Sequence, residues 1–372
     1  MADRPGWYIG LMSGTSMDGI DAVLVRFGPD GIEHSEHLSH TYPDDLHRQL
    51  EALAANEGTP ATLGWADARL GDAFADCALA VVTKAGLHPE DITAIGSHGQ
   101  TIQHQPGSST PFTLQIADPN RIAECTGIMT VSDFRRRDIA AGGEGAPLAP
   151  AFHQWLLGHT GQTGCLVNLG GIANITLIPG DGGVPYGHDT GPANRLMDLW
   201  CERHMGTPYD HNGEWAASGV VNQALLAAFL EEPYFTRPAP KSTGREDFNE
   251  QWLESHLAGA ADTFRPEDVQ RTLLELTAVT VTRDIQASTL PNEVFLAGGG
   301  AFNPLLAGRI ASLLPGSRVR STRALGLDPQ CVEGAAFAWL ARQRLQDAPG
   351  NLPSVTGASG PRVLGGVYPG RG

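Results

Sequence analysis

Hydrophobic residues recur along this chain in two kinds of pattern. Short apolar stretches bounded by glycine, proline or polar residues predict β-strands, whereas longer stretches with apolar residues three and four positions apart predict helices. The predicted strands are residues 7–12, 20–27, 93–97, 127–132, 165–169, 172–178 and 293–297. The predicted helices are residues 44–56, 62–86, 193–205, 220–230, 266–288, 303–314 and 330–346. Because both kinds of element alternate, we expect an α/β fold.

The same plan occurs once in each half of the chain. Strands 7–12 and 20–27 flank a turn rich in glycine, serine and threonine, and strands 165–169 and 172–178 flank Gly170 and Gly171, so each pair predicts a hairpin. A length of 372 residues suits two domains of ordinary size. We expect a first lobe of residues 1–134, to which the tail at 349–372 returns, and a second lobe of residues 135–348.

Composition narrows the class of protein. Hydrophobic residues make up 41% and charged residues 18%, as in a folded soluble protein. The formal net charge of −16 repels nucleic acid, and the three arginines at 135–137 are too few to overcome it, although they suffice for one small anion. No leader or membrane-spanning run is visible, so we expect a cytoplasmic protein without a membrane partner. Five widely spaced cysteines predict buried thiols and neither a disulfide framework nor a zinc site.

Two familiar ways of binding nucleotide phosphates do not fit this sequence. Lys84 and Lys241 are its only lysines, and neither completes a P-loop. The glycine run at 298–303 lacks the third glycine of the dinucleotide motif. A phosphate site must therefore be built in another way.

Glycine turns offer that alternative, because phosphates can lie against the backbone N–H groups of a tight turn. Three turns have this composition, at residues 13–16, 168–174 and 297–302. Asp18 and Asp21 follow the first and supply carboxylates for Mg²⁺ or its water shell. Any one of these turns could be a plain polar hairpin turn, but three together favour a nucleotide.

Six segments together resemble the signature segments of the anhydro-N-acetylmuramic acid kinase family. They occur in order over nearly the whole chain, at residues 10–21 (GLMSGTSMDGID), 96–101 (GSHGQT), 133–138 (DFRRRD), 189–194 (DTGPAN), 241–246 (KSTGRE) and 298–303 (GGGAFN). The resemblance implies the α/β fold shared by actin, hexokinase and the ATPase of heat-shock chaperones, which has two RNase H-like lobes with ATP in the cleft between them. It also implies a homodimer.

The reaction of that family gives several residues an expected role. It opens a 1,6-anhydro sugar with water and phosphorylates the freed O6 from ATP with Mg²⁺, giving N-acetylmuramic acid 6-phosphate and ADP in peptidoglycan recycling. Asp189 is the expected base for the water, although a helix-capping or turn aspartate would have the same spacing. Glu333 matches a family position near the sugar, whereas an isolated glutamate is more often solvated or capping.

The remaining expected contacts fall into two sets. Those for the sugar lie at the end of a predicted strand or in the arginine run, and they are Ser97, His98, Gln100, Arg136 and Arg137. Arg136 or Arg137 would hold the lactate carboxylate or orient Asp189. Those for ATP lie in the glycine turns: Gly14, Thr15, Ser16, Met17, Asp18, Gly19, Ile20, Asp21, Asn168, Gly170, Gly171, Gly298, Gly299 and Gly300. Asp18 is the expected magnesium residue, directly or through water. His98 and His104 lack the further partners of a metal site.

Three alternatives remain open at this stage. A glycoside hydrolase could use Asp189 and Glu333 as a carboxylate pair, but it would leave the glycine turns unexplained. A non-catalytic ATP-binding switch would use the same hairpins, but it would usually carry a partner-binding domain. A kinase for a different anhydro sugar is the nearest alternative, because the resemblance alone identifies the substrate.

Overall fold

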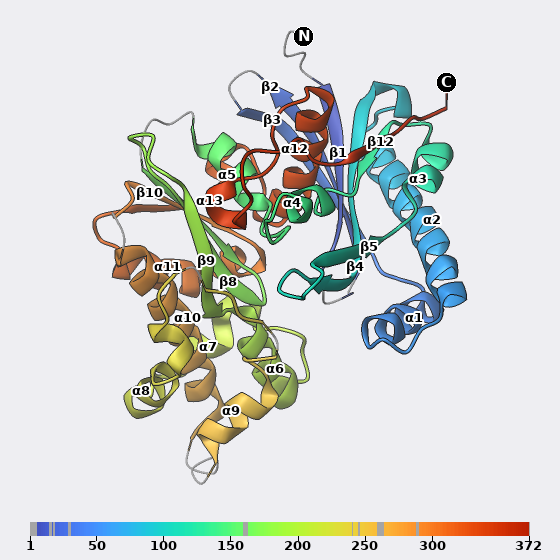
Figure 1. The fold of residues 1–372 in the computed structure, drawn as a ribbon. Coiled ribbons are helices and arrows are strands. Elements are labelled where there is room, and N and C mark those ends of the chain that lie inside the picture. The colour runs from blue at the N-terminus through green and yellow to red at the C-terminus, as the bar shows by residue number, and fades with distance from the viewer. Residues whose placement is uncertain are drawn as a thin grey trace. The chain divides into compact units, whose positions relative to one another are not determined.

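The computed structural model describes residues 6–14, 17, 19–28, 31–158, 163–239, 241–244, 246–258, 264–287 and 290–371. The chain divides into two compact units (Figure 1). The first contains residues 1–159, 325–327 and 331–372, and the second contains residues 160–324 and 328–330. Each unit is built on a β-sheet of its own.

The first sheet begins as an antiparallel meander of β1 (Gly6–Ser13), β2 (Ile20–Gly28) and β3 (Gly31–His40). β4 (Ile92–Gln105) pairs in parallel with β1, and β6 (Thr130–Ser132) pairs in parallel with β4. β5 (Phe112–Ile116) is antiparallel to the second half of β4. The tail returns as β12 (Gly366–Tyr368), which is antiparallel to β6.

The second sheet repeats five of the strands of the first. β7 (Gly164–Leu169), β8 (Ile172–Ile178) and β9 (Tyr186–Pro192) form an antiparallel meander. β10 (Glu293–Ala297) is parallel to β7, and β11 (Arg318–Ser321) is parallel to β10. The order β11-β10-β7-β8-β9 therefore matches β6-β4-β1-β2-β3 in strand order and direction. The predicted pair of RNase H-like lobes is confirmed by this duplicated topology.

Helices cover both faces of the first sheet. They are α1 (Asp44–Ala54), α2 (Pro60–Lys84), α3 (Pro119–Thr126), α4 (Arg136–Ala140), α5 (Ala149–Gly158), α12 (Val332–Leu345) and α13 (Pro353–Thr356). Ile9 and Leu11 of β1 pack with Phe74 and Val81 of α2 in one apolar core. Gly10 faces the other way because side chains alternate along a strand, and there the backbone of α12 lies against it.

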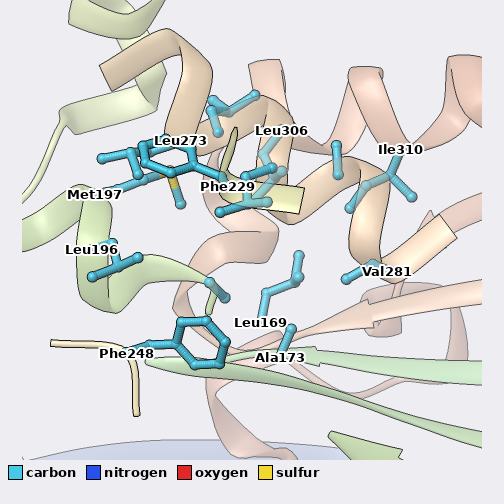
Figure 2. Close-up of a cluster of buried hydrophobic side chains, with 14 of the residues drawn as sticks. Leu169, Ala173, Leu196, Met197, Phe229, Phe248, Leu273, Val281, Leu306 and Ile310 are labelled. Carbon is cyan, nitrogen blue, oxygen red and sulfur yellow. The ribbon is translucent and has the colours of Figure 1, made fainter. Parts of the chain in front are cut away.

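The helices of the second unit are α6 (Asn194–Met205), α7 (Glu214–Ser218), α8 (Gln223–Leu230), α9 (Glu250–Leu257), α10 (Pro266–Gln286) and α11 (Pro304–Leu313). Figure 2 shows how Leu169 and Ala173, at the turn between β7 and β8, lie below side chains of these helices. Leu273 and Val281 of α10 and Leu306 of α11 complete this core. At the turn between β7 and β8 the carbonyls of Gly170 and Gly171 accept hydrogen bonds from the N–H groups of Asn194 and Ala193, at the start of α6.

The units differ from the predicted lobes in three places. Residues 135–159, 325–327 and 331–348 belong to the first unit, although we placed them in the second. The physical reason for the last segment is the close packing of α12 on β1 and β4, which makes it part of the first core. That long-range contact leaves no mark in local sequence pattern.

Several elements were not predicted at all. β3, with the sequence GIEHSEHLSH, has too few apolar residues to stand out, and β9 (YGHDTGP) is dominated by glycine and polar residues. β4 runs on to Gln105, well beyond the predicted end at residue 97.

Four of the five cysteines are buried as expected, but Cys125 is exposed. Among the described residues, no helix is both long enough and apolar enough to cross a membrane.

Candidate active-site residues in the two units

Asp189 lies inside β9, and its carboxylate is held by a neighbouring loop. Oδ2 accepts hydrogen bonds from the Ser242 hydroxyl at 2.8 Å and from the Thr243 backbone N–H at 3.1 Å. Burial raises the pKa of Asp189 above its ordinary value, and these two hydrogen bonds oppose the rise. The helix that follows is capped by Ala193, so Asp189 is not its N-cap.

The loop beside Asp189 is itself anchored by a buried charge cluster. Lys241 Nζ lies 2.9 Å from the Asp284 carboxylate of α10, and His188 Nε2 lies 3.0 Å from the same Oδ2 atom. The Lys241 ammonium also lies over the ring of Tyr234, whose hydroxyl donates to the Asp189 carbonyl at 2.7 Å. The signature segments at 189–194 and 241–246 therefore form one structural unit around the candidate base.

Two of the predicted glycine turns come together in the second unit. Gly298, after β10, has a φ of +76°, and a Cβ there would lie 2.5 Å from Asn168 Oδ1. The Gly170 carbonyl accepts the Asn194 N–H at 2.9 Å, and the Asn194 side chain donates to the Leu169 carbonyl at 2.9 Å. The β7–β8 turn, the start of α6 and the turn after β10 thus form a continuous backbone surface.

Three glycines on this surface have no need, within the protein, to be glycine. A Cβ would have ordinary contacts at Gly170 (3.5 Å), Gly171 (3.8 Å) and Gly299 (3.6 Å), and none of the three has a positive φ. Gly298 and Gly300 differ, because a Cβ at Gly300 would lie 2.7 Å from that of Leu169. The surface at 170, 171 and 299 is therefore open for a ligand to approach the backbone closely.

A cavity of about 600 Å³ adjoins these turns within the second unit. Its lining comes from α6, the 209–212 segment, α10 and the turn into α11: Asn194, Met197, Asp198, Tyr209, Asp210, His211, Asn212, Gln270, Gly299, Gly300, Phe302, Asn303 and Gln330. This volume lies within the range of small-molecule sites. Of the residues predicted for ATP, Gly299 and Gly300 line it.

A buried polar cluster of Ser13, Tyr42 and Gln100 lies next to the first hairpin turn. Ser13 Oγ lies 2.8 Å from the Gly19 carbonyl and 2.7 Å from Gln100 Oε1, and the Tyr42 hydroxyl hydrogen-bonds to Ser13. Gln100 Nε2 donates to the Gly14 carbonyl at 3.2 Å. Gln100 was predicted to contact the sugar, but its amide is buried and bonded to protein atoms on both sides. Its observed contacts shape the turn.

The predicted residue His98 is buried and contacts an arginine that was not predicted. Its Nδ1 lies 2.9 Å from the Gly99 carbonyl, so Nδ1 carries the proton and Nε2 accepts from Arg135 Nε at 2.9 Å. Burial, then the Arg135 charge, lowers the pKa of His98 well below its usual value. Ser97, the preceding residue, is also buried, and its hydroxyl has no partner among the described residues.

Glu333 lies in the first turn of α12, close enough to Arg135 for their charges to interact. Its side chain is accessible to solvent, yet surrounding protein atoms desolvate the carboxyl. This desolvation raises the pKa of Glu333, the nearby Asp21 charge adds to the rise, and Arg135 opposes it. Burial also lowers the pKa of Arg135 to about 10, while Glu333 opposes that change, so the guanidinium stays charged at neutral pH.

Asp21 lies at the start of β2, and side chains of the neighbouring strand β3 hydrogen-bond to its carboxylate. Its Oδ1 accepts from His37 Nε2 at 3.1 Å and from the Ser39 hydroxyl. Burial raises the pKa of Asp21, but the hydrogen bonds of these two residues outweigh it and hold the pKa below its ordinary value. Thr15, Ser16 and Asp18, predicted for the phosphates and for magnesium, lie outside the described residues.

Arg136 and Arg137, the other two arginines of the run, do not lie next to His98. Arg136 and Arg137 are exposed and line a cavity of about 560 Å³ that also contains Arg344 and Asp347 from the end of α12. Arg136 Nε lies 3.7 Å from Asp133. The structure thus distinguishes the three arginines, with Arg135 next to His98 and the other two apart from it.

Sequence reasoning missed Arg135, Ser242 and Thr243 as individual residues. All three stood in the segments that carried the family resemblance, but a run of three arginines does not reveal which side chain turns inward. Gln270 and Asp198, which line the cavity, had no sequence signal because they occur as ordinary residues in helical patterns. In the described part of the chain, no group of three or more His, Cys, Asp or Glu residues is placed to hold a metal ion.

Comparison with known sequences gives one family. The sequence pattern of the family described as "Anhydro-N-acetylmuramic acid kinase" matches residues 6–370. The anhydro-N-acetylmuramic acid kinase of Xanthomonas campestris pv. campestris strain 8004 is 52% identical, and the match covers 97% of this chain and 97% of that protein. The anhydro-N-acetylmuramic acid kinase of Shewanella loihica is 48% identical, and the match covers 98% of this chain and 99% of that protein. Among solved structures, the activator of the 2-hydroxyisocaproyl-CoA dehydratase from Clostridium difficile with bound ADPNP has a TM-score of 0.45 and 14% identity, covering 91% of this chain and 96% of that one.

Proposed function

Since this chain belongs to the family of anhydro-N-acetylmuramic acid kinases, we propose that it opens the 1,6-anhydro ring of 1,6-anhydro-N-acetylmuramic acid with water and transfers the γ-phosphoryl group of ATP to O6. The products are N-acetylmuramic acid 6-phosphate and ADP, and the reaction belongs to peptidoglycan recycling. Water adds to C1 as the C1–O6 bond breaks, and O6 then takes the phosphoryl group.

The observation that carries the proposal is the environment of Asp189. A base for water must be ionised and oriented, and its basicity should exceed that of a free aspartate. The hydrogen bonds from Ser242 and Thr243 fix the orientation of the carboxylate, and burial raises its pKa. Asp189 would take a proton from the water as it attacks C1. As O6 leaves C1 it gains negative charge, which makes it the nucleophile for the γ-phosphate.

The pair of Glu333 and Arg135 supports a role at the sugar. Glu333 has a raised pKa and remains accessible to solvent, so it could exchange a proton or hold a sugar hydroxyl. Arg135 keeps a positive charge near it and is fixed by His98 and by the Gly145 carbonyl at 2.8 Å. The role expected of Arg136 or Arg137, to hold the lactate carboxylate of the sugar or to orient Asp189, is assigned here to Arg135.

The open glycine surface of the second unit supports ATP binding. At Gly170, Gly171 and Gly299 even an added Cβ would have only ordinary contacts with the described residues, as expected where phosphate oxygens approach backbone N–H groups. The first hairpin turn, held by Ser13 and Gln100, is the second proposed phosphate contact. Magnesium would neutralise charge on the transferring phosphates, and Asp18 remains the proposed residue for it, directly or through water.

The proposal also includes a homodimer in the cytoplasm. Both features come from the family alone. Sedimentation of the purified chain tests the first, since a dimer should have twice the chain mass of 39.4 kDa. A chain that stays at the single mass at all concentrations would remove the dimer from the proposal and leave the reaction unaffected.

The test of the reaction compares two sugars. Purified protein with Mg²⁺ and ATP should release ADP and form N-acetylmuramic acid 6-phosphate in equal amounts from the anhydro sugar. It should act far more slowly on N-acetylmuramic acid, which has no strained ring to open. Opening of the anhydro sugar without ATP would indicate a glycoside hydrolase instead, and ATP binding without turnover of either sugar would indicate a switch protein.

A further inference from the structure

Only one of the two carboxylate oxygens of Asp189 is held by the protein. Oδ2 accepts from the Ser242 hydroxyl at 2.8 Å and from the Thr243 N–H at 3.1 Å, whereas Oδ1 accepts no hydrogen bond from the residues that the structure describes. Two hydrogen bonds on one oxygen fix the plane of the carboxylate and leave the other oxygen free to take a proton. The orientation of this candidate base therefore depends on where the backbone of residues 242–243 lies.

The segment that carries both donors, residues 241–244, forms neither a helix nor a strand. The Lys241 side chain ties it to a distant helix, because Nζ lies 2.9 Å from Oδ2 of Asp284 on α10. Both side chains are buried, with 4% of Lys241 and 13% of Asp284 exposed. The ammonium also lies 5.1 Å from the centre of the Tyr234 ring. The position of the segment is thus set by a buried ion pair.

Asp284 is a rigid attachment point for this pair. Val281 and Ile285, beside it on α10, are fully buried in the core of the second unit. The same Oδ2 atom lies 3.0 Å from Nε2 of His188, the residue next to Asp189 on β9. A single carboxylate oxygen therefore joins the strand that carries the candidate base to the segment that orients it.

Stability alone does not account for a buried ion pair. Removing two charges from water costs about as much free energy as their attraction returns, so an uncharged pair of similar volume is often as stable. What the pair does provide is a defined geometry, since the ammonium must stay beside one carboxylate oxygen. The contacts of Asp284 with both the strand and the segment favour a positioning role.

We propose that Lys241 and Asp284 are positioning residues for the base. Their ion pair keeps both hydrogen-bond donors on Oδ2 of Asp189, so that Oδ1 is the oxygen that takes the proton from water. The water oxygen bonds to C1 as this proton passes to Oδ1, and the electron pair of the C1–O6 bond stays on O6. The assignment rests on the proposed function for the role of Asp189 as the base.

The titration of Asp189 reports whether the segment is in place. Burial raises its pKa, and the hydrogen bonds from Thr243 and Ser242 oppose that rise, so releasing them raises the pKa further. Two other charged groups act on this carboxyl, His188 lowering the pKa and Glu246 raising it. Because a base works when ionised, a higher pKa moves the acid limb of kcat/KM to higher pH.

The test follows this acid limb and, independently of turnover, the carbon-13 NMR titration of the Asp189 carboxyl, whose signal is identified by its loss in Asp189→Asn. The double variant Lys241→Met with Asp284→Asn removes both charges, so neither is left buried without its partner. It should lower kcat about 10- to 100-fold and move the limb and the NMR titration to higher pH. Adding Ser242→Ala should move them little further, because that hydrogen bond is already lost. Lys241→Arg, which can keep the ion pair, should retain the wild-type limb.

The matched control is another ion pair of the same helix. Arg309 of α11 lies 2.7 Å from the buried carboxylate of Glu275 on α10, and it ties α10 to α11 instead of to the 241–244 segment. Glu275→Gln with Arg309→Met removes both of these charges. Whatever its effect on the melting temperature, this control should leave the acid limb and the NMR titration in place.

Each outcome decides the assignment. A folded Lys241→Met, Asp284→Asn variant that keeps the wild-type limb and NMR titration would overturn it, even if that variant melts at a lower temperature. A shift to lower pH, or an equal shift in the control, would also overturn it. If the double variant fails to fold while the control folds, the pair serves folding and the assignment falls. A wild type that does not turn over the anhydro sugar would reject the proposed function, and the NMR titration would still decide whether the pair positions Asp189.

Discussion

Arg135 donates a hydrogen bond of 2.9 Å from its Nε to Nε2 of His98. The bond requires a neutral histidine, and both burial and the arginine charge lower the pKa of His98 enough to keep it neutral. The histidine therefore acts as a fixed acceptor that holds a cation near Glu333. This contact links two of the signature segments, GSHGQT and DFRRRD, in one structure.

Replacing Arg135 should damage catalysis more than replacing either neighbour. Arg135→Ala removes a partner from the buried His98 and the charge that opposes protonation of Glu333. A buried hydrogen bond to a charged group contributes about 1.5–3 kcal/mol, so kcat/KM for the sugar should fall roughly 10- to 150-fold. Arg137→Ala, an exposed arginine two residues on, is the matched control and should fall less than about threefold. Equal losses in both variants would show that position 135 has no special role.

The glycine surface makes a prediction that separates binding from folding. At Gly171 a Cβ would have no contact closer than 3.8 Å, so Gly171→Ala should leave the melting temperature unchanged while weakening ATP binding about tenfold or more. Gly298→Ala should instead lower the melting temperature, because φ is +76° and the new Cβ would meet Asn168 at 2.5 Å. Calorimetry for the affinity and thermal melting for the stability check both. Unchanged ATP affinity in Gly171→Ala would place the phosphates elsewhere.

The packing of α12 on the first sheet depends on glycine. At Gly96 a Cβ would lie 2.0 Å from the Phe337 carbonyl oxygen of α12, so Gly96→Ala must push the helix from the sheet. We expect a loss of about 1–3 kcal/mol or more in the free energy of unfolding, measured with denaturant. Gly64→Ala, on the exposed side of α2 with nothing within 4 Å, should stabilise by about 0.5–1 kcal/mol. A similar change in both variants would contradict the close packing.

The pH dependence of activity should follow the carboxyl of Asp189. A base works when ionised, so activity should fall as pH decreases through the pKa of Asp189, which burial places above the ordinary value. The Ser242 hydrogen bond lowers that pKa, so Ser242→Ala should move the acid limb of kcat/KM to higher pH. Ser255→Ala, an exposed serine of the same unit that bonds only to its own helix, should leave the limb in place. A shift to lower pH in Ser242→Ala would contradict the assigned hydrogen bond.

Local sequence pattern predicted the framework of the fold well. The hairpins β1–β2 and β7–β8, the strand β10 and the helices α2, α10 and α11 fall close to their predicted places, because each has a clear apolar period or a glycine turn. β3 and β9 were not predicted because their residues are mostly polar or glycine. The assignment of α12 to the first unit was not predicted, because it depends on the close contact of Gly96 with α12, a helix more than 200 residues later in the chain.

The candidate site was predictable by segment more than by side chain. Asp189 and Glu333 were named from the sequence, and the structure gives both a perturbed pKa with a physical cause. Which arginine turns inward could not be read from three adjacent arginines, since helix phase at a short helix such as α4 is set by packing.

The most direct measurement of the central claim compares wild type with Asp189→Asn under saturating Mg²⁺ and ATP. Asparagine has the same shape, and its oxygen can still accept from Ser242 and Thr243, so the variant should keep its melting temperature and its ATP affinity. We predict that sugar-dependent ADP release falls about 10²- to 10⁴-fold, together with formation of N-acetylmuramic acid 6-phosphate. Wild-type turnover by a folded Asp189→Asn variant would show that the base for the water lies elsewhere and would contradict the account.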